Sequence, residues 1–297
     1  MHHVILGPGG VGGLVGASLA HCGEKVTMVG RPETMAAYPA EIQLNSAFGT
    51  FHVAADHASQ VPDADVVWIT VKATQLEPAL QSFSEKTQVQ AVIPLLNGID
   101  HVARLRVKYG RERLIPATIA VEAERVAPGR FEHRSPFANL NLASSGEAFL
   151  GGTIATLAGI GFTCRFIPNE ATLLWGKLVF LAPLALVSTA SGKIVGEFLA
   201  NPTFRERVFA CVRETCSVAV KEGATVDPEA ILKTISNLPP HLRSSMQKDV
   251  EQGRTPELDA IAGPILRGAS RHGLAVPVTQ ELVELVEQKA GAGKLVK

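Results

Sequence analysis

This sequence has no excess charge of either sign, because 28 lysines and arginines balance 28 aspartates and glutamates. A chain without a charge excess has no general electrostatic attraction to nucleic acid or to an anionic membrane, although basic residues can still cluster locally. Long apolar runs are also missing. The longest, residues 178–187, contains Pro183 and is shorter than the roughly 18 residues that indicate a membrane span. We therefore expect neither nucleic acid nor a membrane as a partner.

Cysteine is scarce, and no two cysteines have the C-x-x-C spacing of a zinc or redox site. We interpret all four as reduced, buried thiols and expect no metal site. They are Cys22, Cys164, Cys211 and Cys216. Only residues 1–3 precede the first predicted strand, so we expect no signal peptide and a cytoplasmic protein. The chain of 297 residues is long enough for two domains with separate cores.

Glycine is abundant near the start of the chain, where its spacing is informative. Residues 4–6 predict a buried strand, and small residues alternate with apolar ones from residue 11, as in a helix packed closely on a sheet. The glycines between them follow the dinucleotide-binding spacing G-x-G-x-x-G, in the strand–turn–helix context that this fingerprint requires. The expected cofactor-binding residues are Gly7, Pro8, Gly9, Gly10, Val11 and Gly12.

Each fingerprint glycine has its own role in such a site. Gly7 permits a tight turn, Gly9 lets the backbone approach a pyrophosphate, and Gly12 allows close packing of helix on strand. The unpaired N–H groups at the start of the helix then face the phosphate charge. The alternative interpretation is a glycine-rich turn that binds nothing.

The tip of the second predicted strand, residues 25–29, bears on the choice of cofactor. NAD-binding folds usually carry an acidic residue there for the ribose hydroxyls, whereas this chain has Arg31. A guanidinium can bind the 2′-phosphate of NADP, which a carboxylate would repel. We therefore expect NADP; the alternative is a solvated arginine beside Glu33.

Two further apolar runs, residues 64–72 and 91–96, are typical of parallel strands covered on both faces. They end at Lys72 and Asn97. Because ligands of open parallel sheets bind at the carboxyl ends of the strands, these residues and Arg31 occupy candidate binding positions. A solvated lysine and an Asn-Gly turn are the plainer interpretations of the first two.

The rest of the first half is rich in strands. Residues 41–55 predict a small hairpin, and residues 149–158 predict a helix. We expect four further segments to form later, partly antiparallel strands of one mixed sheet: residues 115–121, 129–133, 139–143 and 163–167. Pro168 follows the last of these, so we place the domain boundary there, with domains at 1–167 and 168–297.

The second half is predicted to be all-helical. Its first helix starts near residue 169, kinks or ends near Pro183, and is apolar almost all round. Lys177 is the exception, and lysine is almost never fully buried unless it is paired. Either its side chain reaches water, or it projects into a cleft where its charge has a function.

The remaining helices are expected at residues 202–222, 227–238, 241–250, 255–263 and 278–289, with a frayed tail from residue 290. Thr255 followed by Pro256 is a typical helix start, a capping residue and then proline at the first helical position. An acidic Glu257 suits the positive end of that helix, which alone would explain it.

Three stretches together resemble the ketopantoate reductase family (2-dehydropantoate 2-reductases), and their order and spacing match across essentially the whole chain. They are residues 7–12 with Arg31, residues 175–178 (WGKL), and residues 244–249 (SSMQKD) followed by 255–259 (TPELD). The resemblance implies an α/β fold with an N-terminal Rossmann-type domain, an all-α C-terminal domain and an active site between them. It also implies NADPH-dependent reduction of a 2-oxo acid to a 2-hydroxy acid, on the route to pantothenate and coenzyme A.

The resemblance assigns roles by position. Lys177 would be the general acid that protonates the carbonyl oxygen, and Glu257 would hold that lysine and contact the substrate. Ser245 would bind the substrate carboxylate. Lys72 and Asn97 would line the cofactor and nicotinamide side of the site. A fixed ammonium also suits this chemistry on physical grounds, because hydride addition builds negative charge on oxygen.

The chain departs from the family in the substrate cage, because three family asparagines are replaced by Leu181, Ala185 and Leu242. We expect reduction of 2-dehydropantoate to pantoate, with Leu181 among the substrate-binding residues. One alternative is a related reductase for a more apolar 2-oxo acid, and another is a non-catalytic NADP-binding protein. The sequence leaves a homodimer open.

Overall fold

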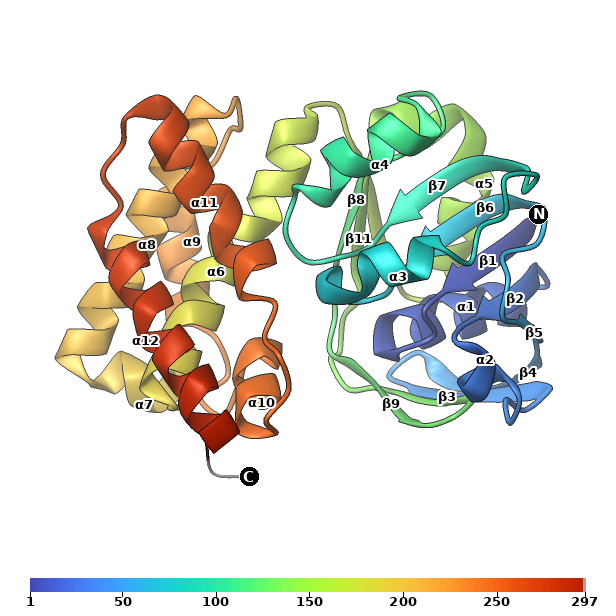
Figure 1. Ribbon diagram of the computed structural model, residues 1–297, viewed down its shortest axis with the longest axis horizontal. Coiled ribbons are helices and arrows are strands. Elements are labelled where there is room, and N and C mark those ends of the chain that lie inside the picture. The colour runs from blue at the N-terminus through green and yellow to red at the C-terminus, as the bar shows by residue number, and fades with distance from the viewer. Residues whose placement is uncertain (296–297) are drawn as a thin grey trace. The chain divides into compact units, whose positions relative to one another are not determined.

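The computed structural model describes residues 1–295, which form two compact units (Figure 1). Unit 1 comprises residues 1–96 and 101–173, and unit 2 comprises residues 97–100 and the chain from Leu174 onward. The division lies six residues beyond the boundary predicted after residue 167, because the helix that begins at Glu170 has its first turn in unit 1. The prediction also missed that a short segment of the first half belongs to unit 2.

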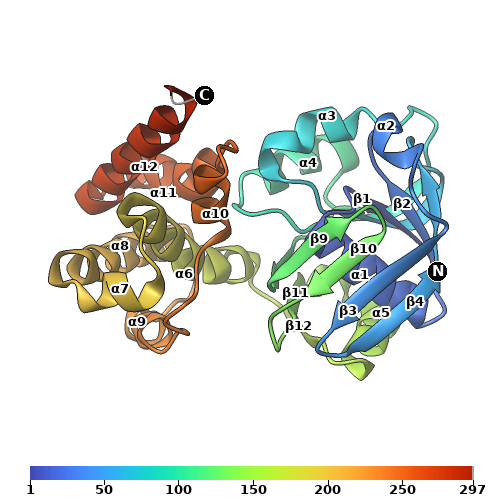
Figure 2. The same cartoon turned by 90° about the horizontal axis from the view of Figure 1, so that it is seen from below.

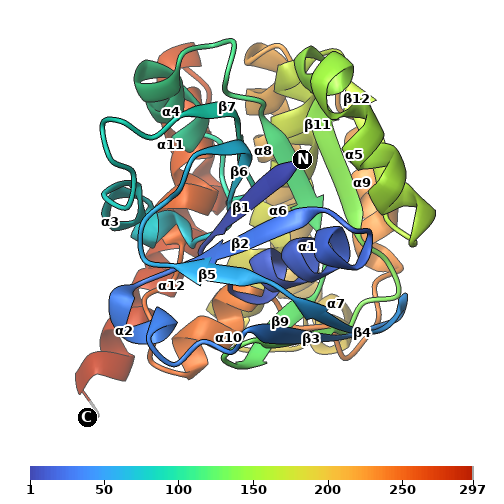
Figure 3. The ribbon, with the colours of Figure 1, turned by 90° about the vertical axis from the view of Figure 1, so that its right-hand side faces the viewer.

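Unit 1 is built on a five-stranded parallel sheet, in the order β5-β2-β1-β6-β7 (Figure 3). The strands are β1 (His2–Leu6), β2 (Lys25–Val29), β5 (Asp56–Ala58), β6 (Ala64–Ile69) and β7 (Val89–Pro94). The central strands β1 and β6 are buried along almost their whole length, as their β-branched apolar sequences predict. β1, with neighbours on both sides, brings the glycine turn to the middle of the carboxyl edge.

Helix α1 (Gly10–His21) lies between this sheet and a second one, and its glycines make both contacts possible. A Cβ added to Gly16 would lie 2.4 Å from Met28 of β2, and one added to Gly13 would lie 2.0 Å from the Phe131 ring. Side chains at either position would therefore collide with side chains of the facing sheet, which would have to move. The small-residue pattern of this segment thus reflects packing on two faces, where the sequence had suggested one.

The second sheet covers α1 and has the order β4-β3-β10-β9 (Figure 2). Its strands are β3 (Glu41–Ser46), β4 (Gly49–Ala54), β9 (Ala123–Ala127) and β10 (Arg130–His133). The predicted hairpin is confirmed, since β3 and β4 pair antiparallel. β10 joins β3 in parallel and β9 antiparallel.

A third sheet has the order β12-β11-β8, so the prediction of one mixed sheet is wrong. The strands are β8 (Ala117–Ala120), β11 (Asn139–Ala143) and β12 (Thr163–Ile167). β8 and β11 are antiparallel, whereas β11 and β12 are parallel. An isolated parallel bridge from Val92 to Leu114 connects the segment before β8 to β7. The later strands separate because β9 and β10 cover α1 instead of extending the first sheet.

Short helices complete unit 1. They are α2 (Pro32–Met35), η1 (Ala73–Gln75), α3 (Leu76–Leu80), α4 (His101–Tyr109), η2 (Ser144–Gly146) and α5 (Glu147–Gly159). Only α5 was predicted. α4 was missed because it is polar on most of its surface and buries only His101, Val102 and Leu105.

Unit 2 is all-helical, as predicted, and α6 (Glu170–Ser191) is its apolar helix. The helix continues through Pro183, so the expectation that it could end there is wrong. Among the described helices, α6 is long and apolar enough to cross a membrane by length and composition. However, 67% of its most apolar window is buried inside the structure, as in the core helix of a globular unit.

The other helices of unit 2 are α7 (Val195–Ala200), α8 (Pro202–Lys221), α9 (Pro228–Ser236), α10 (Ser245–Glu251), α11 (Leu258–His272) and α12 (Pro277–Leu295). α7 was not predicted, and several predicted bounds are wrong: α10 begins at Ser245 instead of residue 241, and α11 continues to His272 instead of ending at residue 263. α11 begins after Glu257 instead of at Pro256, because Glu257 has the non-helical dihedral angles φ −81° and ψ 42°. α12 continues to Leu295, so residues 290–295 of the tail predicted to fray are helical, and the last two residues of that tail lie outside the described residues.

Candidate functional site

The glycine turn after β1 has the geometry of a tight turn that leads into a helix. Gly7 has φ +91° and donates its N–H to the Val29 carbonyl of β2 at 2.8 Å. A Cβ on Gly7 would lie 2.3 Å from the Val71 side chain, and one on Gly12 would lie 2.4 Å from the Thr70 hydroxyl. Both positions therefore require glycine for the protein's own packing.

Gly9 differs from its neighbours because space around it is open. Its backbone is extended, and the nearest atom to an added Cβ is the Gly7 oxygen, 3.9 Å away. α1 starts at Gly10, so the N–H groups of its first turn have no carbonyl partner within the helix. An open backbone beside a helix N-terminus fits a dinucleotide pyrophosphate, as the fingerprint predicted.

Two other segments lie against the turn, one directly after β6 and the other in β9 of the second sheet. The Thr70 hydroxyl donates to the carbonyl oxygens of Leu6, at 3.1 Å, and Gly7, at 2.8 Å. On the other side, a Cβ on Gly10 would lie 2.1 Å from the Ala123 oxygen of β9. The sequence interpretation missed Thr70, although a threonine at the end of the strand beside β1 is a signal that could have identified it.

The two cationic residues predicted at strand ends lie on unit 1. Arg31 follows β2 immediately before α2; its side chain is 77% exposed and pairs with Glu33 at 3.4 Å. Arg31 is thus available to a ligand, with only a weak surface ion pair to exchange. Lys72 lies three residues after β6, part-buried, where the backbone turns into η1.

The residues predicted to carry the chemistry come together in unit 2. The Lys177 Nζ of α6 donates to the Asn97 Oδ1 at 2.9 Å, and the Asn97 Nδ2 donates to the Glu257 Oε2 at 2.9 Å. An ammonium can only donate, and a carboxylate can only accept. The amide is therefore oriented with its oxygen toward the lysine and its nitrogen toward the glutamate. Asn97 links residues that are 80 and 160 positions away in the sequence.

Within this hydrogen-bonded group of side chains, the pKa of Lys177 is shifted. Burial lowers the pKa of Lys177 from its ordinary 10.5 to about 8, while the negative charge of Glu257 acts in the opposite direction. At pH 7 the ammonium form still predominates by about ten to one. The site thus holds a charged proton donor whose pKa lies close to neutral pH, which suits general acid catalysis.

Glu257 is buried, with 7% of its surface exposed, at the position that precedes α11. A carboxylate at this end of a helix is stabilised by the partial positive charge of the helix N-terminus. Its bond from Asn97 shows that the residue serves more than the helix, contrary to the plainer interpretation that the helix end alone explains it.

The remaining predicted residues are less tightly engaged. Leu181 is part-buried one turn beyond Lys177 on α6, and Ala185 is 1% exposed. Because α6 is continuous through Pro183, Lys177 and both of these residues lie on one broad helix face. Ser245, predicted to bind a carboxylate, is exposed as the first residue of α10.

The buried neighbour of Ser245 was missed. The Ser244 hydroxyl accepts from the Gln247 N–H at 3.1 Å, so Ser244 caps α10, and it lies 2.7 Å from the Ser188 hydroxyl of α6. Extending the face of Lys177 and Leu181 by two turns reaches Ser188, which is how the sequence could have indicated it.

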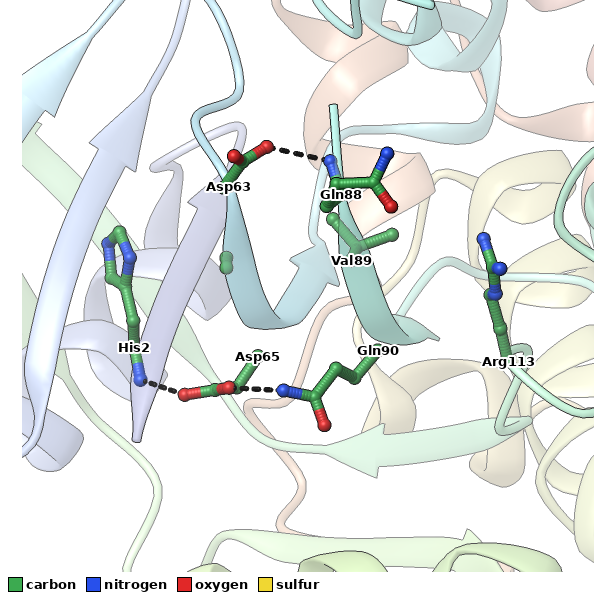
Figure 4. A pocket seen from close by; sticks show the side chains of 8 residues that line it. His2, Asp63, Asp65, Gln88, Val89, Gln90 and Arg113 are labelled. Atoms are coloured by element: carbon green, nitrogen blue, oxygen red, sulfur yellow. Dashed lines mark hydrogen bonds between the residues drawn. The ribbon is translucent and has the colours of Figure 1, made fainter. Parts of the chain in front are cut away.

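A separate pocket of about 530 Å³ lies at the amino ends of β1, β6 and β7 (Figure 4). Its two aspartates are occupied with joining strands. Asp65 accepts from the His2 N–H at 2.7 Å and the Gln90 side chain at 2.6 Å, and Asp63 accepts from the Gln88 N–H at 2.7 Å. The described residues contain no group of three or more histidines, cysteines or acidic residues placed to hold a metal.

Comparison with known proteins shows that two family models match this chain, one over each half. Ketopantoate reductase PanE/ApbA matches residues 3–145, and the C-terminal region of the same family matches residues 171–290. A 2-dehydropantoate 2-reductase from Caulobacter vibrioides is 30% identical over 294 residues, with 96% of this chain and 98% of that protein covered.

Solved structures have the same fold along the whole chain. A ketopantoate reductase from Ralstonia eutropha superimposes with a TM-score of 0.87 at 24% identity, covering 99% of this chain and 100% of the other. A D-mandelate dehydrogenase solved with NADH and anilino(oxo)acetate gives the same TM-score at 23% identity, with the same shares of each chain covered. The sequence patterns, which between them span both compact units, show that this chain is an oxidoreductase of the ketopantoate reductase family.

Proposed function

We propose that this protein reduces a 2-oxo acid to the corresponding 2-hydroxy acid with NADPH, and that 2-dehydropantoate is its best substrate. The observation that carries the proposal is the hydrogen-bonded chain from Lys177 through Asn97 to Glu257. This arrangement provides a proton donor, a neutral group that orients it and a carboxylate that favours its charged form.

In the proposed reaction the carbonyl carbon gains a hydride and the carbonyl oxygen gains a proton. When bound, the reduced nicotinamide supplies the hydride. The Lys177 ammonium stabilises the negative charge that develops on the oxygen and donates its proton there, leaving a neutral amine. Asn97 fixes the direction of the ammonium, and Glu257 supports its reprotonation by raising the pKa.

For the cofactor, we assign the pyrophosphate to the turn formed by residues 7–12. Two observations support this assignment: the space around Gly9 is open, and the N–H groups at the start of α1 have no carbonyl partner within the helix. We assign the 2′-phosphate of NADP to Arg31, because its guanidinium is exposed at the end of β2. Lys72 and Asn97 are proposed to contact the nicotinamide side.

For the substrate, we assign the carboxylate to Ser245 and the apolar branch to Leu181. A second candidate function follows from Leu181, Ala185 and Leu242, which replace carboxamides of the family: reduction of a more apolar 2-oxo acid without a terminal hydroxyl. An apolar preference of this kind is worth only about 1–3 kcal/mol, so a broad substrate range is expected.

The experiment is NADPH oxidation with a panel of 2-oxo acids that includes 2-dehydropantoate and 2-oxoisovalerate. We expect turnover with 2-dehydropantoate, and a Lys177→Ala variant that binds NADPH but is slower by about 10²- to 10⁴-fold. A higher kcat/KM for 2-oxoisovalerate would favour the second candidate. NADPH binding without turnover of any oxo acid would instead indicate a non-catalytic binding protein. Light scattering of the same preparation tests whether the protein forms the homodimer that the sequence leaves open.

A further inference from the structure

Residues 97–100 follow one stripe of helix α11, although they are far from that helix in the sequence. Asn97 bonds Glu257, immediately before the helix, and the Asp100 carboxylate pairs with Arg267 near its far end. Between them, a Cβ on Gly98 would lie 2.1 Å from the Ala260 oxygen. Positions 257, 260, 264 and 267 are spaced by three or four residues, so they lie on one helix face.

Pro264 changes the hydrogen bonding of the Ala260 carbonyl that faces Gly98. Proline has no N–H, so Pro264 cannot donate the usual helical hydrogen bond to the Ala260 carbonyl four residues earlier. Gly98 fits against this carbonyl because it has no side chain and because its φ of +80° is open to glycine. The helix and the segment are therefore complementary at the residue next to Asn97.

The contact at Arg267 depends on Gly263. The Arg267 guanidinium spans Asp100 and Asp259, and its Nη1 lies 2.7 Å from the Asp259 Oδ1. It passes directly over Gly263, where a Cβ would lie 2.2 Å from the Arg267 Nη2 and 2.5 Å from the Asp259 carboxylate. Glycine is less favourable than alanine in mid-helix, and here it leaves room for the bridge that Arg267 forms between Asp100 and Asp259.

We propose that Gly98, Gly263 and Arg267 are positioning residues, which seat residues 97–100 on α11 and thereby hold Asn97 between Lys177 and Glu257. The inference rests on the proposed function, since it assigns these residues to the same proton-donating site. Arg267 is 46% exposed, and exposed ion pairs contribute little to stability. Its effect is therefore expected on the geometry of Asn97 and not on the stability of the fold.

The test compares Gly263→Ala and Arg267→Ala with a matched control, Arg271→Ala. Arg271 lies one turn further along the same helix and pairs with Glu222 at 2.7 Å, outside the bridge. We expect Gly263→Ala to keep or raise Tm, because alanine is the better helix former, and yet to lose about 10-fold or more in kcat. Arg267→Ala should lose kcat similarly, Arg267→Lys should recover part of it, and Arg271→Ala should match the native protein.

Two further measurements separate positioning from a general structural effect. A displaced Asn97 removes the oxygen that accepts from the Lys177 ammonium, so the pKa of Lys177 should fall and the alkaline limb of kcat should move to lower pH. In an Asn97→Ala background, neither Gly263→Ala nor Arg267→Ala should reduce kcat further, because the residue they position is already gone.

The outcomes are distinct. Native kcat and pH profile in Gly263→Ala and Arg267→Ala, together with impaired Asn97→Ala and Lys177→Ala, would overturn this inference alone. Full activity in Lys177→Ala and Asn97→Ala would overturn the proposed function and the inference with it. Additive losses in the Asn97→Ala background would show that the bridge acts by another route, which also contradicts the proposal.

Discussion

At the scale of the residue, Lys177 combines a charge with partial burial, and the pH dependence should reveal both. Its pKa is lowered to about 8, so the protonated donor is lost as the pH rises through that value. We expect kcat/KM to fall about tenfold per pH unit on the alkaline side, with a midpoint near 8 instead of near the ordinary 10.5. Steady-state kinetics from pH 6 to about 10.5 measure the midpoint.

The sign of two linked effects follows from the same group. Glu257 raises the pKa of Lys177, so Glu257→Gln should move the midpoint below 8. A lowered lysine pKa also means that the unfolded chain binds more protons between 8 and 10.5, so this residue's contribution to stability rises with pH in that window. A midpoint near 10 in the native enzyme would contradict the assignment of Lys177 as the donor.

Arg31 should decide between the two nicotinamide cofactors. A charge-assisted contact with a phosphate is worth about 1.5–3 kcal/mol, so Arg31→Ala should weaken NADPH binding roughly 10- to 150-fold. NADH has no 2′-phosphate, and its binding should hardly change. Fluorescence titration with both cofactors measures this, with Arg111→Ala as an exposed control in the same unit. Equal affinity of the native protein for NADPH and NADH would contradict the prediction.

Leu181 should influence the choice of substrate. Leu181→Asn introduces a carboxamide one turn from Lys177, and one hydrogen bond to a substrate hydroxyl is worth about 0.5–1.5 kcal/mol. We expect the ratio of kcat/KM for 2-dehydropantoate over 2-oxoisovalerate to rise about 2- to 13-fold. Leu181→Ala separates the lost apolar contact from the gained amide. A native preference for 2-dehydropantoate above roughly a thousandfold would show that the missing asparagines do not limit it.

At the scale of the element, the turn between β1 and α1 allows binding to be tested apart from folding. Gly9→Ala adds a methyl group that meets no protein atom closer than 3.9 Å, in an extended backbone that alanine adopts freely. The variant should keep the native Tm but bind NADPH roughly 10- to 100-fold more weakly, because the methyl group occupies the approach of the pyrophosphate.

The control for this turn is Gly151→Ala on α5, where an added Cβ meets nothing within 4 Å. It should leave cofactor affinity unchanged and slightly raise Tm through helix propensity. Native affinity in Gly9→Ala, measured by calorimetry, would show that the pyrophosphate binds elsewhere.

Helix α12 depends on α8 for its N-terminal cap. Glu214 of α8 accepts from the Val278 N–H at 3.0 Å, and from the N–H and hydroxyl of Thr279 at 2.8 and 2.7 Å. Glu214→Ala leaves these donors unpaired, which should lower the free energy of unfolding by about 1–3 kcal/mol. Urea denaturation measures it. Glu206→Ala, exposed on the same helix, should stay within about 0.5 kcal/mol of the native protein, and equal losses in both would contradict the cap.

At the scale of the whole molecule, the sequence predicts the strands and long helices well, because each is bounded by a local signal. β1, β2, β6 and β7 are apolar runs that end at glycine, proline or polar residues, and α8 follows an Asn-Pro start. The candidate proton donor could also be identified from the sequence, because Lys177 is the single cation in a long apolar stretch.

The grouping of strands into sheets could not be predicted from these signals. β10 covers α1 instead of extending the first sheet, and its Phe131 packs against α1 at Gly13, where there is no side chain. This is a contact between segments that are distant in the sequence, so local signals do not reveal it. The start of α11 was misplaced for a related reason: Thr255 and Pro256 form a plausible local start, but Glu257 takes a non-helical backbone and bonds Asn97.

The membership of residues 97–100 in unit 2 has a consequence for recombining this chain with its relatives. The first family model ends at residue 145 and the second begins at residue 171. The region between them is an obvious place to join one protein's first half to another's second half in a chimaera. Such a crossover would pair Asn97 and Gly98 of one parent with the α11 of the other. A productive exchange should therefore carry Gly98 and Asp100 together with Ala260, Gly263, Pro264 and Arg267, even though the crossover lies far from all of them.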